Sequence, residues 1–323
     1  MREPSHAAPR GGFTAVDVLL LFTVTVWGVN VVVVKLALAT MHPLLFNSTR
    51  FLLAAVLSLT LLQVSEPGHR LRRADLPVIV GLGLLGHVVY QVLFIFGISF
   101  TTAGNTSLLL ATMPIWVAVF SAMFRLDDVN LFTWLGIACS FFGIALVVLG
   151  GGKSVAFALS SFRGDAMILV ATMLMATYTL LSRPLLGRYS PLQLSSYTMA
   201  AGAVAMFLVS LPVILRTDFR AVAPIGWGGV VFSSVFAVVM GYYVWNRGLQ
   251  LLGPARTAIY NNLSPVVAMI TGWAVLSERI TSTQGIGAAL IFAGLLLARR
   301  RQRNKNATIS TGSTGTNIAG QRL

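Results

Sequence analysis

Long apolar segments, separated by short polar ones, fill most of this chain. A helix needs roughly 20 apolar residues to cross a bilayer core about 30 Å thick. The apolar positions are continuous and do not alternate with polar ones, which argues against the strands of a β-barrel. The pattern therefore predicts ten helical spans: Val16–Ala39, Pro43–Val64, Leu76–Ile98, Ala103–Phe124, Leu131–Leu149, Gly164–Leu185, Pro191–Leu215, Gly226–Leu249, Pro254–Leu276 and Thr281–Ala298.

Composition agrees with this reading. Hydrophobic residues make up 56% of the 323 positions and charged residues only 10%, whereas soluble domains carry roughly a quarter charged residues. We therefore expect an all-α integral membrane protein. The first segment, Val16–Ala39, is too long for the apolar core of a secretory signal and is followed directly by further spans, so we expect it to stay in the mature protein.

The net charge of +14 would suit nucleic acid if the basic residues formed one patch, but they follow the loops instead. With the N-terminus in the cytoplasm, sixteen of the 23 Lys and Arg residues fall on the cytoplasmic side and five on the other. This asymmetry predicts cytoplasmic termini in a cell membrane, of which a bacterial inner membrane fits best, and no nucleic-acid partner. The polar tail after position 299 is expected to be disordered.

Two halves of the chain resemble each other. A shift of 148 aligns Asp17 with Asp165 and Pro43 with Pro191, and a shift of 151 aligns seven later pairs, among them Pro114 with Pro265. Each half holds five spans, and because five is odd, the second copy must enter the membrane upside down. We predict two inverted five-helix repeats, 16–149 and 164–298, with a linker at 150–163 and tails at 1–15 and 299–323. In transporters such repeats enclose a binding site near the bilayer midplane; a duplicated scaffold is the alternative.

Several short motifs, spread over both halves of the chain, carry a family resemblance. They are Trp27-Gly28-Val29-Asn30 with Lys35, Arg50-Phe51, Thr102-Ala103-Gly104 leading to Pro114, Pro254-Ala255 leading to Pro265, and Leu276-Ser277-Glu278-Arg279. In their order and spacing the chain resembles the drug/metabolite transporter superfamily, specifically its EamA-type members. The turn at 125–128 departs from that pattern because it lacks the Glu-Arg pair. The resemblance implies ten helices, cytoplasmic termini, a central cavity and small organic solutes that are often exported.

Polar and aromatic side chains within the spans are the candidates for a solute site, because polar groups in hydrocarbon are costly unless they face a cavity or one another. In the third span, four of them recur at helical spacing, and the eighth span repeats the pattern. An aromatic pocket with amide and hydroxyl groups would suit an amphipathic solute. The predicted substrate-binding residues are Trp27, Asn30, His87, Tyr90, Gln91, Phe94, Tyr178, Tyr242, Trp245, Asn246, Asn261 and Ser264.

Each candidate also has a structural alternative. Aromatic residues near span ends often anchor a helix at the interface, and Asn, Ser and Thr often bond only to neighbouring helices. His87 could be a neutral core residue, or it could couple transport to protons. For Arg50 the alternatives are snorkelling to the interface and a structural ion pair. Pro114 and Pro265 are candidate kinks.

Signatures of an enzyme are missing from the sequence. It contains no phosphate-binding loop with its lysine, no His-Glu-x-x-His and no cysteine pair, since Cys139 is the single cysteine. All nine acidic residues lie at or near predicted span ends or in loops. We therefore expect no enzyme, no catalytic residue, no cofactor and no metal site, and no self-contained ATP-driven pump.

Together these patterns predict a transporter of small organic metabolites, amino acids or related amphipathic solutes, working by alternating access and in the direction of export. The partners are then a small-molecule substrate and the lipid bilayer, with protons as a coupling ion left open. The competing reading is a membrane binding or scaffold protein without a transport cycle. The sequence makes no prediction of the oligomeric state.

Overall fold

Helices make up nearly all of the described chain. The computed structural model describes residues 14–68, 70–124, 131–149, 155–278 and 281–299, and none of these residues belongs to a strand. The turn at 125–128, nearly all of both predicted tails and the first five residues of the predicted linker, 150–154, lie outside them. The α-helices are α1 Ala15–Leu38, α2 Pro43–Ser65, α3 Leu76–Leu84, α4 Tyr90–Phe100, α5 Ala103–Leu110, α6 Met113–Met123, α7 Leu131–Leu149, α8 Val155–Ser182, α9 Pro191–Ile214, α10 Pro224–Phe232, α11 Gly241–Tyr260, α12 Ser264–Leu276 and α13 Ser282–Arg299.

Local sequence explains where several helices begin. Proline occupies the first turn of α2 and α9, where its missing N–H would have had no intrahelical partner. Before α9, the Ser190 hydroxyl accepts a bond from Gln193 N at 3.0 Å, and Gln193 Oε1 accepts one from Ser190 N at 3.1 Å. This reciprocal cap satisfies two amides at the helix start.

Seven helical stretches of the described chain are long and apolar enough to cross a membrane. They are Ala15–Leu38, Pro43–Ser65, Arg73–Phe100, Ala103–Met123, Ser161–Gly187, Pro191–Ile214 and Pro224–Leu252. Ser264–Leu276 and Trp134–Gly143 are shorter apolar helical stretches. The prediction of an all-helical chain with many apolar spans is confirmed, and the predicted number of ten is taken up below.

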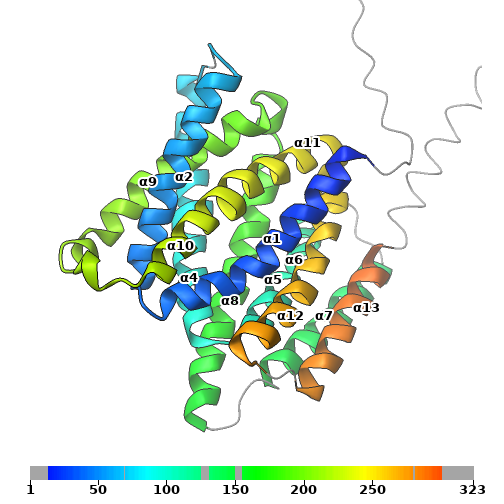
Figure 1. The fold of residues 1–323 in the computed structure, drawn as a ribbon. Coiled ribbons are helices and arrows are strands. Elements are labelled where there is room, and N and C mark those ends of the chain that lie inside the picture. Colours follow the sequence, from blue (N-terminus) through cyan, green and yellow to red (C-terminus); the bar gives the residue numbers. More distant parts are fainter. Residues whose placement is uncertain (1–13, 69, 125–130, 150–154, 279–280, 300–323) are drawn as a thin grey trace, which may run out of the picture.

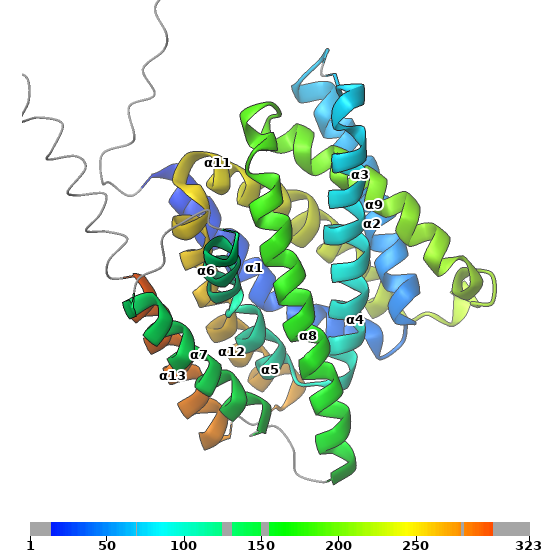
Figure 2. The same ribbon diagram turned by 180° about the vertical axis from the view of Figure 1, so that it is seen from behind.

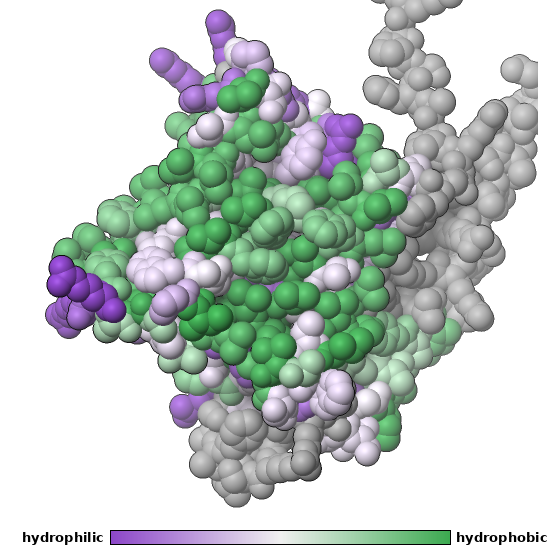
Figure 3. Space-filling model, viewed as in Figure 1, coloured by the Kyte–Doolittle hydropathy of each residue, from purple (hydrophilic) through white to green (hydrophobic). Residues whose placement is uncertain are grey.

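The outside of the bundle carries many apolar side chains. Large hydrophobic side chains point outward on many helices, for example Val56 on α2, Leu208 on α9 and Trp273 on α12, which is 66% exposed. Figure 3 shows hydrophobic residues over most of one face, with hydrophilic residues gathered at its ends and edges. Such a surface suits lipid rather than water.

Helices from distant parts of the sequence pack in pairs. The pairs α2 with α9, α4 with α8, α1 with α12 and α7 with α13 make the most extensive contacts. Figures 1 and 2 show α7 and α13 side by side at one edge of the bundle, with α1 and α8 crossing its centre. The buried hydrophobic side chains of this centre form two large clusters, each with residues from both halves of the chain.

The contact of α7 with α13 depends on glycines. A methyl group on Gly143 would lie 2.6 Å from Gly287 O, and one on Gly294 would lie 2.4 Å from Gly136 O. Both approaches are closer than any Cβ tolerates, so only glycine lets the two backbones meet. Ser140 Oγ also donates to Ile291 O at 3.3 Å across the same contact.

Helical segments are interrupted at four places near the middle of the bundle. A π-helical turn at Leu85–Val89 joins α3 to α4, and a longer one at Ser233–Met240 joins α10 to α11. The helix of the fourth predicted span breaks between α5 and α6, just before Pro114, and a 3-10 turn at Asn261–Leu263 precedes Pro265. Such interruptions leave backbone groups outside the regular helical bonding pattern.

The predicted boundaries differ from the observed ones in two places. α8 begins at Val155, so part of the predicted 150–163 linker is helical. The prediction ended one span at Leu249 and began the next at Pro254, but α11 continues without a break from Gly241 to Tyr260. Pro254 therefore lies inside α11, where its missing N–H removes one intrahelical bond without ending the helix.

Candidate functional site

A cavity lies at the centre of the bundle and takes its walls from both halves of the chain. Its volume is about 100 Å³, and about 780 Å³ when the open space at its mouth is included. The lining comes from α1, α2, α4, α5, α6, α8, the π-helical turn before α11, α11, the 3-10 turn after it, and α12. The lining residues are Trp27, Asn30, Val31, Arg50, Tyr90, Gln91, Phe94, Leu110, Met113, Thr172, Met175, Ala237, Val238, Tyr242, Trp245, Asn261 and Ser264.

Nine of the twelve predicted site residues surround this cavity: Trp27, Asn30, Tyr90, Gln91, Phe94, Tyr242, Trp245, Asn261 and Ser264. The structure thus brings together side chains that lie up to 237 positions apart in the sequence. That these residues contact a solute stays a prediction, because lining a cavity does not by itself demonstrate binding.

Aromatic rings form one wall. The Trp27 and Trp245 rings lie 5.4 Å apart, one from α1 and the other from α11. Trp27 Nε1 donates to Ala237 O at 2.9 Å, in the π-helical turn, and so holds the ring in place. Tyr90 and Phe94 stack one helical turn apart on α4, with ring centroids 6.0 Å apart. These rings provide flat apolar surfaces of the kind that hold the apolar part of a solute.

Amides and hydroxyls supply the polar part of the lining. Asn30 Oδ1 accepts a bond from Ser233 Oγ at 2.5 Å, and Asn261 Nδ2 donates to Leu110 O at 3.4 Å. Gln91 Nε2 points at the Tyr242 hydroxyl at 3.5 Å. Each of these bonds joins one half of the chain to the other, so the polar lining also ties the two halves together.

The remaining three candidates, His87, Tyr178 and Asn246, do not line the cavity and are packed behind its wall. All three are fully buried. The His87 ring lies 4.8 Å from that of Tyr242 and 5.8 Å from that of Tyr178, and His87 Nε2 lies 3.2 Å from Thr198 Oγ1. Asn246 Nδ2 donates to Ser195 Oγ at 2.8 Å. This placement favours the structural alternative of a packed core residue for His87, and a solute-binding role for the three is not supported by their position.

The π-helical turn explains why His87, contrary to the prediction from the sequence, does not share the face of Tyr90, Gln91 and Phe94. A spacing of three, four and seven residues selects one face only if every turn holds 3.6 residues. The wider turn at Leu85–Val89 holds more, so His87 is rotated away from Tyr90, Gln91 and Phe94. The spacing of polar residues in one sequence does not reveal such a turn.

The structure adds Arg50 to the lining. The two roles predicted for this residue, snorkelling to the interface and a structural ion pair, are both wrong within the described chain. Arg50 is 2% exposed, so it does not snorkel to an interface. The two ion pairs among the described residues, Lys35 with Glu278 and Arg188 with Asp75, do not include it. Thr172 and Met175 also line the cavity and were absent from the predicted site, since small or thioether side chains in a span look like ordinary core residues.

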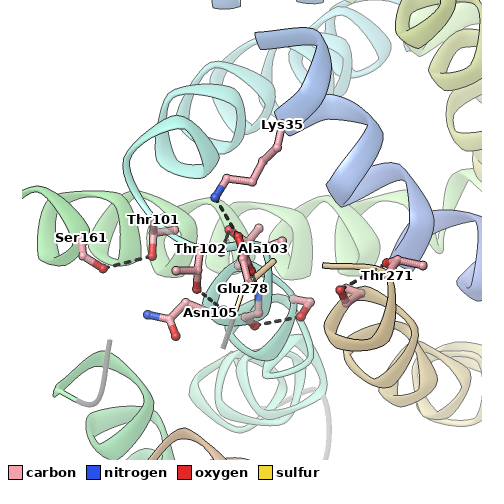
Figure 4. Close-up of polar contacts among 12 residues, drawn as sticks. Lys35, Thr101, Thr102, Ala103, Asn105, Ser161, Thr271 and Glu278 are labelled. Carbon is pink, nitrogen blue, oxygen red and sulfur yellow. Dashed lines mark hydrogen bonds and ion pairs between the residues drawn. The ribbon is translucent and has the colours of Figure 1, made fainter. Parts of the chain in front are cut away.

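A second polar cluster lies at one end of the cavity, one helical turn beyond the lining residue Val31 (Figure 4). Lys35 Nζ of α1 lies 3.0 Å from Glu278 Oε1, just after α12. The same carboxylate accepts bonds from Ala103 N at 3.0 Å and Gly104 N at 3.3 Å, at the start of α5. An anion is favoured there because the first amides of a helix have no intrahelical acceptor. Glu278 thus holds α1, α5 and α12 together.

Asp165 builds a neighbouring contact between α8 and the start of α5. Its Oδ1 accepts a bond from Thr101 Oγ1 at 2.6 Å, and its Oδ2 accepts one from Asn105 Nδ2 at 3.0 Å. Thr101 Oγ1 also lies 3.2 Å from Ser161 Oγ, and Figure 4 shows the two side chains pointing toward each other. Gln284 of α13 donates to Asn105 Oδ1 at 2.5 Å. Asp165 therefore ties α8 to the start of α5, next to the contacts of Glu278.

At the opposite end, contacts again join the two halves. Tyr260 donates to Asp17 at the start of α1. Tyr189 OH donates to Asp75 Oδ2 at 2.8 Å, and Arg188 Nη1 lies 3.0 Å from Asp75 Oδ1. Burial and the bond to the Asp75 carboxylate raise the pKa of the Tyr189 phenol above its ordinary value.

No group of three or more His, Cys, Asp or Glu side chains that could hold a metal occurs among the described residues. Within that part of the chain, the candidate site is therefore a cavity with one guanidinium, several amides and aromatic walls. Such a lining can hold a solute by hydrogen bonds, charge and ring contacts.

Comparison with known proteins gives a consistent picture. A sequence profile of the EamA-like transporter family matches the chain twice, over residues 14–149 and 162–300. An uncharacterized transporter of Bacillus subtilis, YyaM, is 34% identical over 77% of this chain and 82% of its own length. An uncharacterized transporter of Archaeoglobus fulgidus is 27% identical over 88% and 99%.

Two further matches add detail. A probable terminal-alkyne amino-acid exporter of Streptantibioticus cattleyicolor is 28% identical over 75% of this chain and 80% of its own length. A crystal structure superposes with a TM-score of 0.64 at 17% identity, over 90% of this chain and 99% of that one. At that identity the superposition speaks for the fold alone.

Proposed function

The chain belongs to the EamA-like transporter family and is a multi-pass membrane transporter, and from this we propose that it exports amino acids or related amphipathic metabolites by alternating access around the central cavity. The observation that carries the proposal is the cavity itself, whose aromatic and amide lining comes from both halves of the chain. The named exporter among the relatives supports the direction and the solute class. Small solutes that are partly apolar fit such a lining.

We further propose ten spans arranged as two inverted five-helix repeats. The family profile matches each half once, which supports a duplication. Residues 151 positions apart touch each other, namely Gln91 with Tyr242 and Ser140 with Ile291. Contact between equivalent positions is expected next to a twofold axis, and a repeat related by translation would separate them.

Reciprocal contacts and interruptions support the same arrangement. Gly136 and Gly143 correspond to Gly287 and Gly294 at the shift of 151. Gly143 approaches Gly287 O and Gly294 approaches Gly136 O, so the same contact occurs twice with the roles of the two halves exchanged. The π-helical turn at Leu85–Val89 has a counterpart 151 positions later within Ser233–Met240, and the break before Pro114 has one before Pro265. Repeated interruptions at equivalent depth provide places where the two halves could flex during a transport cycle.

For the orientation we propose cytoplasmic termini in the cytoplasmic membrane of the cell. The start of α1 and the end of α13 point toward the same side of the bundle in Figures 1 and 2. The excess of Lys and Arg in the loops of that side supports its assignment to the cytoplasm. On this assignment the cluster of Lys35, Glu278 and Asp165 closes the outer end of the cavity.

The proposal is tested by solute flux in proteoliposomes. We expect counterflow of labelled aromatic amino acids with the wild-type protein and a loss of tenfold or more with Trp245→Ala or Gln91→Ala, because each removes a large or polar part of the lining. Trp273→Ala is the matched control, since Trp273 faces outward and should leave flux unchanged. Absence of any flux across a broad metabolite panel would favour the scaffold alternative.

Coupling of transport to protons through His87 can be decided by one measurement. His87 is buried next to Tyr242, which lines the cavity, and its Nδ1 has no partner among the described residues. If His87 couples transport to protons, His87→Ala abolishes the dependence of flux on an imposed pH gradient. If the gradient dependence survives in the variant, His87 is a packing residue.

A further inference from the structure

Arg50 is a buried cation with donors left over. Its Nη2 nitrogen donates to Asn47 Oδ1 at 2.6 Å and to Gln91 Oε1 at 2.7 Å. Its Nε has no partner, and Nη1 has no hydrogen bond to any described residue. A guanidinium carries five N–H donors, so three of them are unused. The phenyl rings of Phe46 and Phe51 cover it, with centroids 5.2 and 5.1 Å from the guanidinium carbon.

The charge of Arg50 is not neutralised by the described protein. Lys35 shows the contrast, because it meets Glu278 at 3.0 Å although it is more exposed than Arg50. A charge buried without a counter-charge is costly, and in membrane spans such groups are retained where they serve a ligand or an ion. Arg50 therefore has both the charge and the donors to receive an anion.

The position of Arg50 directs that anion into the cavity. Arg50 is the one charged residue among those that line it in the described chain. Arg50 Nε is fully enclosed by protein atoms and has no partner, whereas Nη1 is not fully enclosed. Nη1 is therefore the nitrogen that the cavity reaches. The lining also contains no carboxylate that could compete for it, and the aromatic wall of Trp27 and Trp245 lies in the same cavity.

We propose that Arg50 receives the carboxylate of the transported solute, so that the cavity selects monoanionic carboxylates with an apolar body. This inference rests on the proposed transport function and names its substrate class. A single uncompensated cation balances one negative charge, which favours a carboxylate over a phosphate monoester dianion. An amino group on the solute finds no carboxylate in the described lining, and only amides, hydroxyls and ring faces would receive it.

The contact with Gln91 supplies a sharp test. Gln91 Oε1 already lies 2.7 Å from Arg50 Nη2. The isosteric substitution Gln91→Glu would place a carboxylate at that distance, so the protein would neutralise its own guanidinium without losing it. Arg50→Gln removes the charge, and Arg50→Lys keeps it on a different donor. The three variants separate the charge of Arg50 from its bonds to α2 and α4.

The experiment measures binding by purified protein in nanodiscs to a matched series of probes: 3-phenylpropanoate, its amide, phenylalanine, phenylalaninamide and phenyl phosphate. Wild-type protein is expected to bind both carboxylates at least tenfold more tightly than their amides, and phenyl phosphate less tightly than 3-phenylpropanoate. Arg50→Gln and Gln91→Glu should abolish the preference for acid over amide, while Arg50→Lys retains part of it. A melting temperature measured for each variant identifies any that fails to fold.

Two results would overturn the inference. One is a wild-type protein that binds acid and amide equally. The other is a folded Arg50→Gln or Gln91→Glu variant that keeps the wild-type preference for the acid. Flux in proteoliposomes distinguishes this failure from that of the proposed function, because transport of uncharged amides by wild type would leave the carrier function standing while the role of Arg50 falls.

Discussion

The contact of Glu278 with α1 and α5 makes a quantitative prediction about access to the cavity. Glu278→Gln removes the ion pair with Lys35 and weakens the acceptor for Ala103 N and Gly104 N. The residue at position 278 would still fill the same space, so packing changes little. Because the cluster lies one turn from Val31 in the cavity lining, the substitution should favour conformations that are open at this end.

The size of the effect follows from the geometry. The two side chains are 22% and 19% exposed, so their pairing is stronger than that of a fully solvated surface pair, which contributes up to about 1 kcal/mol. The negative charge at the start of α5 adds about 0.3–1 kcal/mol. A total of about 1–3 kcal/mol would shift the equilibrium between closed and open conformations by roughly 5- to 150-fold.

The assay is thiol labelling in membrane vesicles. In a Cys139→Ala background, Val31→Cys places one reactive group in the cavity lining, and a membrane-impermeant maleimide is added on the side opposite the termini. Glu278→Gln should raise the labelling rate by a factor within the range above. Lys35→Gln should raise it less, because Glu278 keeps its bonds to α5.

The double exchange Lys35→Glu with Glu278→Lys serves as the control. It restores the opposite charges, but a lysine cannot accept the amide bonds at the start of α5, so the labelling rate should lie between wild type and Glu278→Gln. If Glu278→Gln folds normally and labels at the wild-type rate, the cluster does not hold this end of the cavity closed and the reasoning is refuted.

Two further predictions concern stability. Gly294→Leu should lower the free energy of unfolding by about 2 kcal/mol or more because the new side chain meets Gly136 O, while Gly285→Leu on the same helix has open space and should change little, as melting temperatures in detergent will show. Tyr189→Phe should cost about 1 kcal/mol through loss of the bond to Asp75. Because the folded-state pKa of Tyr189 is raised, the bond's contribution is full below pH 10 and declines as pH rises above it, so the difference between wild type and Tyr189→Phe should shrink in unfolding curves above pH 10.

Much of the cavity could be predicted because its signals are local. A polar or aromatic side chain inside an apolar stretch is visible in the sequence, and helical spacing groups Tyr90, Gln91 and Phe94 on one face. The same reasoning misplaced His87, since it assumed a regular helix through Leu85–Val89. It also gave Arg50 only two structural roles, because an unpaired buried cation looks the same in sequence as a paired one.

By itself the sequence determined the class of the protein: apolar stretches long enough for a bilayer, basic loops on one side, two related halves and an aromatic, amide-rich set of span residues. These properties depend on composition and spacing within about twenty residues. Only the tertiary structure decided which distant groups meet. Glu278 reaches Lys35 across 243 positions, and no carboxylate in the described chain reaches Arg50. Such contacts depend on how helices cross in three dimensions, and hydropathy along the chain holds no record of those crossings.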